Sequence, residues 1–314
     1  MSYAPSTGRS WARTSLLALG LLGCPAPPGA GDPDRPAPGA VVPTAADPTA
    51  AASHAATASA DSARPRPPLT FRAVPIDSGR PYRQLVRELG PDRLTLLLKL
   101  NRVDLDHLRA GDTLFLPADE SLGPLDIAPF PVRVPALDSF PKFLVVEQRI
   151  QAFAAYELGH LVFWGPTSTG KRSTPTPNGL FHTTWKAKET RSTENAAWLL
   201  KWYFNFENHR GVSLHQYDLP GYPASHACVR LLAEDAEWIY RWADQWVLTA
   251  NGARVIKPGT PVLVFGEYRF GDPAPWRQLG TDPAASTTTV ADIAEALAGY
   301  RPGGVPAAAR DSTG

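Results

Sequence analysis

The chain has 314 residues, enough for one or two domains, and carries 31 basic against 30 acidic side chains for a net charge of +1. This balance excludes the strongly basic surface that many nucleic-acid-binding proteins share, and we predict no nucleic-acid partner. Two cysteines are too few for a disulfide framework. Cys24 and Cys228 lie in unlike surroundings, so we expect each to have its own role.

The N-terminus has the features of a secretory signal. Arg9 and Arg13 precede the apolar run 16–23, which ends at Cys24 and is too short to cross a bilayer as a permanent helix. The ending Leu-Leu-Gly-Cys resembles a bacterial lipobox, in which Cys24 would be lipidated and become the mature N-terminus. We expect a lipoprotein signal peptide at 1–24 and an exported protein, lipid-anchored in the periplasm or cell envelope. The alternative is an ordinary signal peptide.

Proline is abundant, with 33 residues, and it concentrates between residues 25 and 68 and near the C-terminus. Such segments bury too little apolar surface to fold. We therefore expect a disordered Pro/Ala-rich tether at 25–68 and a mostly disordered tail at 271–314, in which 286–300 could form one short amphipathic helix.

The sequence pattern of residues 69–118 predicts a small α+β module. A short strand at 69–74 precedes helical patterns at 82–89 and 94–100, and 108–117 forms a turn and a closing strand. This order resembles a LysM peptidoglycan-binding module, and the residues that carry the resemblance are 100–101 and 108–117. The alternative is a structural spacer without sugar binding.

Residues 139–270 predict a mainly β catalytic domain with one substantial helix. Short apolar or alternating runs indicate strands, and 232–246 has the i, i+3, i+4, i+7 stripe of a helix. The strands are expected at 143–146, 150–156, 161–164, 180–185, 198–206, 212–215 and 257–265, with a long loop at 186–197. The segment 165–171 (GPTSTGK) lacks the glycine spacing of a phosphate-binding loop, which excludes nucleotide binding there.

The candidate site is the stretch Ser225-His-Ala-Cys-Val-Arg230, preceded by His215. A thiol nucleophile needs a neighbouring base or a positive field, because the thiolate is the reactive form. His215 and His226 could each supply that. The helix that follows is expected to direct its positive N-terminus towards Cys228.

Two other interpretations use the same residues. A zinc site would take His215, His226 and Cys228 with His182 or His209, but no short metal-binding spacing supports it. A buried thiol with incidental histidines explains either residue type alone but not the cluster.

Residues 143–265 resemble the L,D-transpeptidase catalytic domain, the YkuD-like family. The resemblance rests on several short motifs in the same order: 168–171 (STGK), 175–181 (PTPNGLF), His215, 225–230 (SHACVR), 235–236 (DA) and 259–262 (GTPV). It implies a β-sandwich of the L,D-transpeptidase type.

The resemblance also implies a role for each residue. Cys228 is the nucleophile and His215 the general base, with the backbone carbonyl of Gln216 orienting its imidazole. His226, Arg230 and Ser225 shape the pocket and bind the peptide. The backbone N–H groups of Ala227 and Cys228 form the oxyanion hole. The family usually has glycine where Ala227 stands, and glycine is favoured where the backbone needs a positive φ.

The implied reaction is peptidoglycan L,D-transpeptidation, a cysteine acyl transfer from a tetrapeptide stem to an amine, in cell-wall crosslinking and the maintenance of cell shape. Peptidoglycan stem peptides are the expected partners, and no cofactor or metal is expected. The alternatives are an L,D-carboxypeptidase, attachment of a protein to peptidoglycan by the same site, or a non-catalytic wall-binding lipoprotein.

Overall fold

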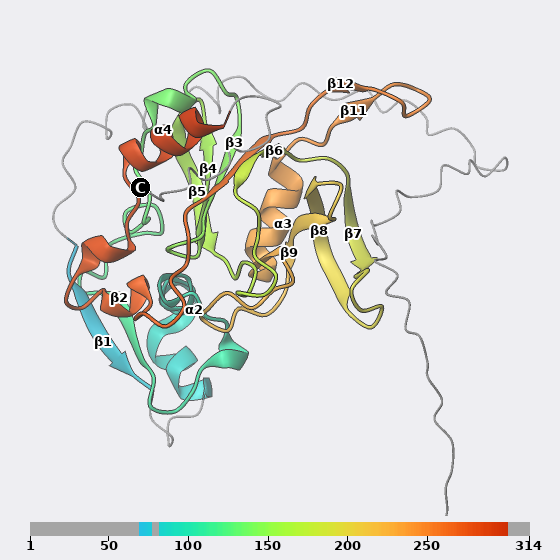
Figure 1. Ribbon diagram of the computed structural model, residues 1–314. Coiled ribbons are helices and arrows are strands. Elements are labelled where there is room, and N and C mark those ends of the chain that lie inside the picture. The colour runs from blue at the N-terminus through green and yellow to red at the C-terminus, as the bar shows by residue number, and fades with distance from the viewer. Residues whose placement is uncertain (1–68, 77–81, 301–314) are drawn as a thin grey trace, which may run out of the picture.

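The computed structural model describes residues 69–76 and 82–300 (Figure 1). The expected lipidation at Cys24, the tether and the last residues of the tail lie outside the described residues. The elements, in chain order, are β1 (Phe71–Pro75), α2 (Tyr82–Asn101), η1 (Leu105–His107), β2 (Thr113–Pro117), η2 (Pro135–Leu137), β3 (Phe143–Glu147), β4 (Ala152–Glu157), β5 (His160–Pro166), β6 (Gly179–His182), β7 (Lys186–Arg191), β8 (Leu199–Glu207), β9 (Val212–Gln216), β10 (Val229–Leu231), α3 (Ala233–Trp242), β11 (Val247–Leu248), β12 (Val255–Lys257), β13 (Pro261–Phe265), η3 (Pro275–Gln278), η4 (Pro283–Ser286) and α4 (Val290–Gly299).

Two sheets form the centre of the molecule. The larger has the strand order β5-β4-β3-β13-β6 and the smaller the order β10-β9-β8-β7. Side chains alternate along β3, so Leu144 and Val146 pack in the core shared with β8, β9, β10 and α3. Phe143 and Val145 point to the opposite face, which is also buried. Burial on both faces explains why this strand is a continuous apolar run in the sequence. The mainly β fold is confirmed.

The N-terminal elements cover the second face of the larger sheet. β1 pairs antiparallel with β2, and α2 packs between this pair and β5. The backbone leaves the helical region at Gly90, which separates the two helical runs expected from the sequence. Leu97 and Leu116 belong to the same apolar core as Phe143 and Trp164. Residues 69–118 are therefore fused to the sheet through a common core.

Two buried cationic side chains, Lys99 and Arg102, connect the N-terminal elements to the rest of the fold. The Nζ atom of Lys99 lies 2.7 Å from Oδ1 of Asp235 in α3. The guanidinium of Arg102 donates to the carbonyl oxygens of Lys99 and Ile150, at 2.6 and 2.9 Å. Burial lowers the pKa of Arg102 to about 9, and the charge of Glu147 acts in the opposite direction. Both side chains thus connect α2 to the β sandwich.

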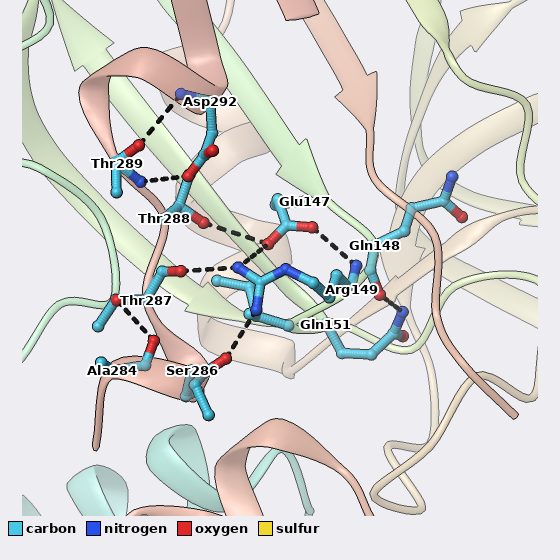
Figure 2. A network of polar contacts seen from close by, with 12 residues as sticks. Glu147, Gln148, Arg149, Gln151, Ala284, Ser286, Thr287, Thr288, Thr289 and Asp292 are labelled. Atoms are coloured by element: carbon cyan, nitrogen blue, oxygen red, sulfur yellow. Dashed lines mark hydrogen bonds and ion pairs between the residues drawn. The ribbon is translucent and has the colours of Figure 1, made fainter. Parts of the chain in front are cut away.

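The segment after β13 differs from the disordered tail that its composition suggested. Residues 271–300 contain η3, η4 and α4, with Trp276, Leu279 and Ile293 buried in the main core. Arg149, in the turn after β3, donates to the carbonyl oxygens of Ala285 and Thr287, at 2.6 and 2.7 Å. Figure 2 shows Arg149 directed towards this segment beside Thr287. The short amphipathic helix expected within 286–300 is present as α4, with a capping box made by Thr289 and Asp292. The buried apolar residues of this segment are isolated between prolines and form no local periodic pattern. Their contacts with the distant core therefore could not be predicted from the sequence.

One loop prediction was wrong. Residues 186–191 form β7, which pairs with β8, although their side chains are polar and partly exposed. An edge strand exposed to solvent needs no apolar pattern, because β8 supplies its hydrogen bonds. Among residues 69–76 and 82–300, no helix is both long and apolar enough to cross a membrane.

Candidate active site

The parallel pair β9 and β10 brings the candidate residues together. Val229 lies opposite Leu214, and Arg230 lies opposite His215. Leu214 and Val229 point into the sandwich core, so by strand alternation their neighbours occupy the other face. Extending the register by one residue places Cys228 beside Ser213. His215 and Cys228 therefore lie diagonally on one face of the pair.

His215 is held as a neutral base. Its Nδ1 atom lies 2.9 Å from the carbonyl oxygen of Gln216, which can only accept, so Nδ1 carries the proton and Nε2 is left with a lone pair. Burial lowers the pKa of His215 to about 4, while the hydrogen bond to Gln216 raises it and the charge of Arg230 lowers it further. The imidazole is consequently uncharged and able to accept a proton at neutral pH.

The thiol of Cys228 lies beside two polar groups of the β8–β9 region. Its Sγ atom is 3.4 Å from Oγ of Ser213 and 3.9 Å from the carbonyl oxygen of Gly211. Cys228 is partly exposed, whereas Ser213 is fully buried. A hydroxyl at this position is able to donate to a thiolate.

The peptide before Cys228 is fixed in an unusual conformation. Ala227 has a φ of +80°, the left-handed region that favours glycine. Its carbonyl oxygen accepts from Oγ1 of Thr176 at 2.7 Å, and the carbonyl oxygen of Cys228 accepts from the hydroxyl of Ser225. Because the carbonyl of Ala227 and the N–H of Cys228 share one planar peptide unit, Thr176 fixes the direction of that N–H.

His226 is the second imidazole that lines the cavity of Cys228. Its Nε2 atom is 2.9 Å from Nζ of Lys171, and its ring lies 5.3 Å from the ring of Trp198, centroid to centroid. Its Nδ1 atom is buried and has no hydrogen-bond partner within the described part of the chain. Trp198 belongs to the turn between β7 and β8, where its carbonyl oxygen accepts from the N–H of Ser192.

These side chains surround a narrow cavity of about 40 Å³. It is lined by Ser192, Glu194, Trp198, Leu200, His215, Tyr217, Ser225, His226, Cys228 and Arg230. The guanidinium of Arg230 stacks on Tyr217, with Cζ 4.5 Å from the ring centroid, and its backbone forms a bridge with Ser168. Burial lowers the pKa of Arg230, whereas Tyr217 and Asp218 raise it. Five of the expected site residues line the cavity, namely His215, Ser225, His226, Cys228 and Arg230, while Gln216 and Ala227 contribute through their backbone.

The helix after the site does not contact the thiol. The strand β10 separates Cys228 from Leu232, the N-cap of α3, and a strand of that length spans about 13 Å. The field of a helix end fades within one turn, so the expected assistance from α3 was wrong. Ser213 is the polar neighbour instead.

The zinc interpretation has no matching geometry. His215 directs Nδ1 to a carbonyl oxygen and His226 directs Nε2 to an ammonium. His182 lies in β6, which belongs to the other sheet. Within the described part of the chain, no three His, Cys, Asp or Glu side chains are grouped as metal ligands.

Four residues near the site were not assigned a role from the sequence: Lys171, Thr176, Trp198 and Ser213. Lys171 and Thr176 belong to the motifs at 168–171 and 175–181, so the sequence marks both residues. It does not show that Lys171 contacts His226 or that Thr176 contacts the carbonyl of Ala227. Ser213 lies two residues before His215 on the same strand face, which alternation alone could have revealed.

The comparisons with known proteins concern the segment that contains these residues. Residues 141–264 match the family model described as the L,D-transpeptidase catalytic domain, YkuD. No curated protein matches the chain. Among solved structures, it is similar to an L,D-transpeptidase from Stackebrandtia nassauensis, with 25% identity, a TM-score of 0.34, and coverage of 43% of this chain and 59% of that one.

Two structures from Mycobacterium tuberculosis are also similar. L,D-transpeptidase 1 has 20% identity and a TM-score of 0.31, with coverage of 40% of this chain and 62% of that one. An L,D-transpeptidase from strain H37Rv has 17% identity and a TM-score of 0.32, with coverage of 63% and 91%. The chain spans about three fifths of the length of the first structures that it matches. The family assignment concerns one segment: residues 141–264 match the L,D-transpeptidase catalytic domain.

Proposed function

We propose that this protein is a peptidoglycan L,D-transpeptidase that uses Cys228 as its nucleophile. The observation that carries the proposal is the arrangement of β9 and β10, which puts a neutral, Nδ1-protonated His215 on the same strand face as the thiol of Cys228. A base that is oriented by a third group, next to a nucleophile, is the general pattern of covalent catalysis.

The first half-reaction is acylation of Cys228. The thiol loses its proton to Nε2 of His215 as Sγ attacks the carbonyl carbon of the third residue of a tetrapeptide stem. The charge on the carbonyl oxygen is met by the N–H groups of Ala227 and Cys228. Collapse of this intermediate breaks the peptide bond, and D-alanine leaves as its nitrogen takes the proton from His215. A thioester remains on Cys228.

The second half-reaction restores the enzyme. An acceptor amine attacks the thioester carbonyl while His215 takes its proton, and the sulfur leaves and is reprotonated. Because burial lowers the pKa of His215, its imidazole is neutral at rest and acts as a general base towards the thiol of Cys228. Arg230 and His226 bind the peptide, with the guanidinium suited to a carboxylate.

The decisive experiment is intact-mass spectrometry of the protein incubated with a purified tetrapeptide muropeptide or with a carbapenem. We expect a covalent adduct on the wild type and none on Cys228→Ala, whereas Cys24→Ala should acylate normally. Absence of any adduct on the wild type would favour a non-catalytic wall-binding protein. With the muropeptide, a dimer as product supports transpeptidation, release of tripeptide alone supports a carboxypeptidase, and labelling of a protein lysine supports protein attachment.

The remaining expectations from the sequence belong to the same proposal. The protein would be exported and attached to a membrane through a lipid on Cys24, and residues 69–118 would bind glycan as a LysM module. Metabolic palmitate labelling tests the anchor, since label that persists in Cys24→Ala contradicts it. Sedimentation of the Cys228→Ala protein with purified murein, with and without free glycan fragments as competitor, tests glycan binding.

A further inference from the structure

The loop that contains Lys171 is fixed to the segment before Cys228. The N–H of Lys171 donates to the carbonyl oxygen of Ser225 at 3.0 Å, and Oγ1 of Thr174 donates to the same oxygen at 3.1 Å. Gly170 forms a parallel bridge with Ser225. A side chain at Gly170 would meet the backbone of Thr174 and Thr176, so the loop needs glycine to lie this close. Lys171 is therefore held beside His226 by backbone contacts.

The contact between these two side chains determines where the proton of His226 lies. An ammonium has three donors and no acceptor, so at 2.9 Å Nζ of Lys171 donates and Nε2 of His226 accepts. A proton on Nε2 would leave two donors facing each other. The neutral ring must therefore carry its proton on Nδ1.

Among residues 69–76 and 82–300, that proton has no acceptor. Nδ1 of His226 is buried and no described residue accepts from it, while the ring lines the cavity of Cys228 and lies next to the ring of Trp198. A buried donor without an acceptor is costly, and such groups in native proteins mark places that a ligand or water completes.

We propose that Lys171 is a positioning residue: it holds His226 as the neutral Nδ1–H tautomer, so that this proton meets an oxygen of the acyl donor when the donor enters the cavity. The second half of this statement rests on the proposed acyl transfer, whereas the first half does not. Lys171 itself acts through His226 and does not touch the reacting atoms.

The first test reads the tautomer directly. In protein labelled with ¹⁵N-histidine, long-range ¹⁵N–¹H spectra distinguish a protonated from an unprotonated ring nitrogen, and loss of signals in His226→Gln assigns this residue among the seven histidines. We expect Nδ1–H in the wild type and in Lys171→Arg, and a shift towards Nε2–H in Lys171→Met. A wild type protonated on Nε2, or an unchanged tautomer in Lys171→Met, would overturn the proposal.

The second test measures acylation by a carbapenem, followed by intact mass. Lys171→Met should acylate at least about tenfold more slowly, as expected for loss of an oriented hydrogen bond, with Lys171→Arg recovering part of the rate. The matched control is Arg172→Met, the adjacent and exposed cation, which donates to the carbonyl oxygen of Phe270 and should leave both tautomer and rate unchanged.

The two readouts separate the two proposals. A tautomer that depends on Lys171 in a protein that never acylates supports the positioning role and rejects the acyl transfer. Acylation that stays within twofold in Lys171→Met, despite a changed tautomer, rejects the contact between His226 and the acyl donor.

Discussion

The ammonium of Lys99 and the carboxylate of Asp235 lie 2.7 Å apart and are both buried. They join α2, in the N-terminal part of the chain, to the first turn of α3, which directly follows β10 and the candidate nucleophile. Burial raises the pKa of Asp235 to about 6, and the charge of Lys99 opposes that rise. The second oxygen of Asp235 has no hydrogen-bond partner among the described residues, so the charge of Lys99 is what keeps this carboxylate ionised.

Replacing Lys99 with Met should destabilise the protein by about 3–5 kcal/mol, because it leaves a buried carboxylate unpaired. Urea unfolding at pH 7.5 measures the change in free energy. Lys99→Met/Asp235→Leu should recover most of the loss, since replacing both members of a buried pair with apolar residues is often neutral. A single variant within about 1 kcal/mol of the wild type would contradict the account.

Ala227→Gly should make the protein more stable. A methyl group at a φ of +80° costs about 1–2 kcal/mol, and the extra chain entropy of glycine offsets part of this gain. We expect the free energy of unfolding to rise by about 0.5–1 kcal/mol. Ala224→Gly is the matched control three residues away, where φ is not positive, and should lower stability by a similar amount. A less stable Ala227→Gly would contradict strain at this position.

Ser213→Ala should slow acylation without loss of fold. The hydroxyl lies 3.4 Å from Sγ of Cys228 and is placed to donate to the thiolate as it forms. Removing one such donor is expected to slow acylation by about tenfold. Carbapenem acylation followed by stopped flow measures the rate, and thermal unfolding checks the fold. Ser213→Thr keeps the hydroxyl, so equal rates for the Ala and Thr variants would exclude this role.

Acid should both inactivate and destabilise the protein through His215. Its pKa is lowered to about 4 from an ordinary 6.5, so between these two pH values the imidazole is protonated in the unfolded chain and neutral in the folded protein. The resulting stability is complete above pH 6.5 and is lost as pH falls towards 4, by roughly 3 kcal/mol in all. Asp235 acts with the opposite sign, because its raised pKa favours the folded state as pH falls below about 6.

Unfolding of the wild type and His215→Gln between pH 7 and pH 4 isolates the contribution of His215, because that of Asp235 cancels in the difference. The difference in free energy of unfolding should shrink as pH falls. In the wild type, the acidic limb of the acylation rate should lie near pH 4, and a limb at pH 6.5 would contradict a buried neutral base.

The strands of the sandwich could be predicted because buried strands consist of short runs of apolar residues that are visible in the local sequence. The run 143–146 is apolar throughout, and β3 is covered on both faces. The site could be placed because His215 and the stretch 225–230 lie close together in the sequence, and the parallel pairing of β9 with β10, which begins directly after Cys228, brings them together in the fold. In both cases neighbouring residues in the sequence hold the whole signal.

The parts that escaped prediction depend on partners far along the chain. The polar segment β7 is a strand because it pairs with β8. Residues 271–300 pack against a core that is formed largely by residues between 74 and 164. From the sequence alone, Lys99 is expected on the exposed surface of a helix. It is buried because it pairs with Asp235, which lies 136 positions later in the chain. Local periodicity contains no information on such pairs.

Thr176→Val should reduce acylation while leaving the charge and shape of the site almost unchanged. Oγ1 of Thr176 donates to the carbonyl oxygen of Ala227 and accepts from the N–H of Gly170, at 2.7 and 2.9 Å. Losing the first contact frees the peptide whose N–H belongs to Cys228, so the proposed oxyanion donor is no longer fixed. We expect acylation to fall by about ten- to a hundredfold, below the loss of an entire oxyanion donor. Thr287→Val, which loses an exposed hydroxyl contact with the carbonyl oxygen of Ala284 outside the site, is the matched control. Equal rates in the two variants would show that fixing this peptide does not assist the chemistry.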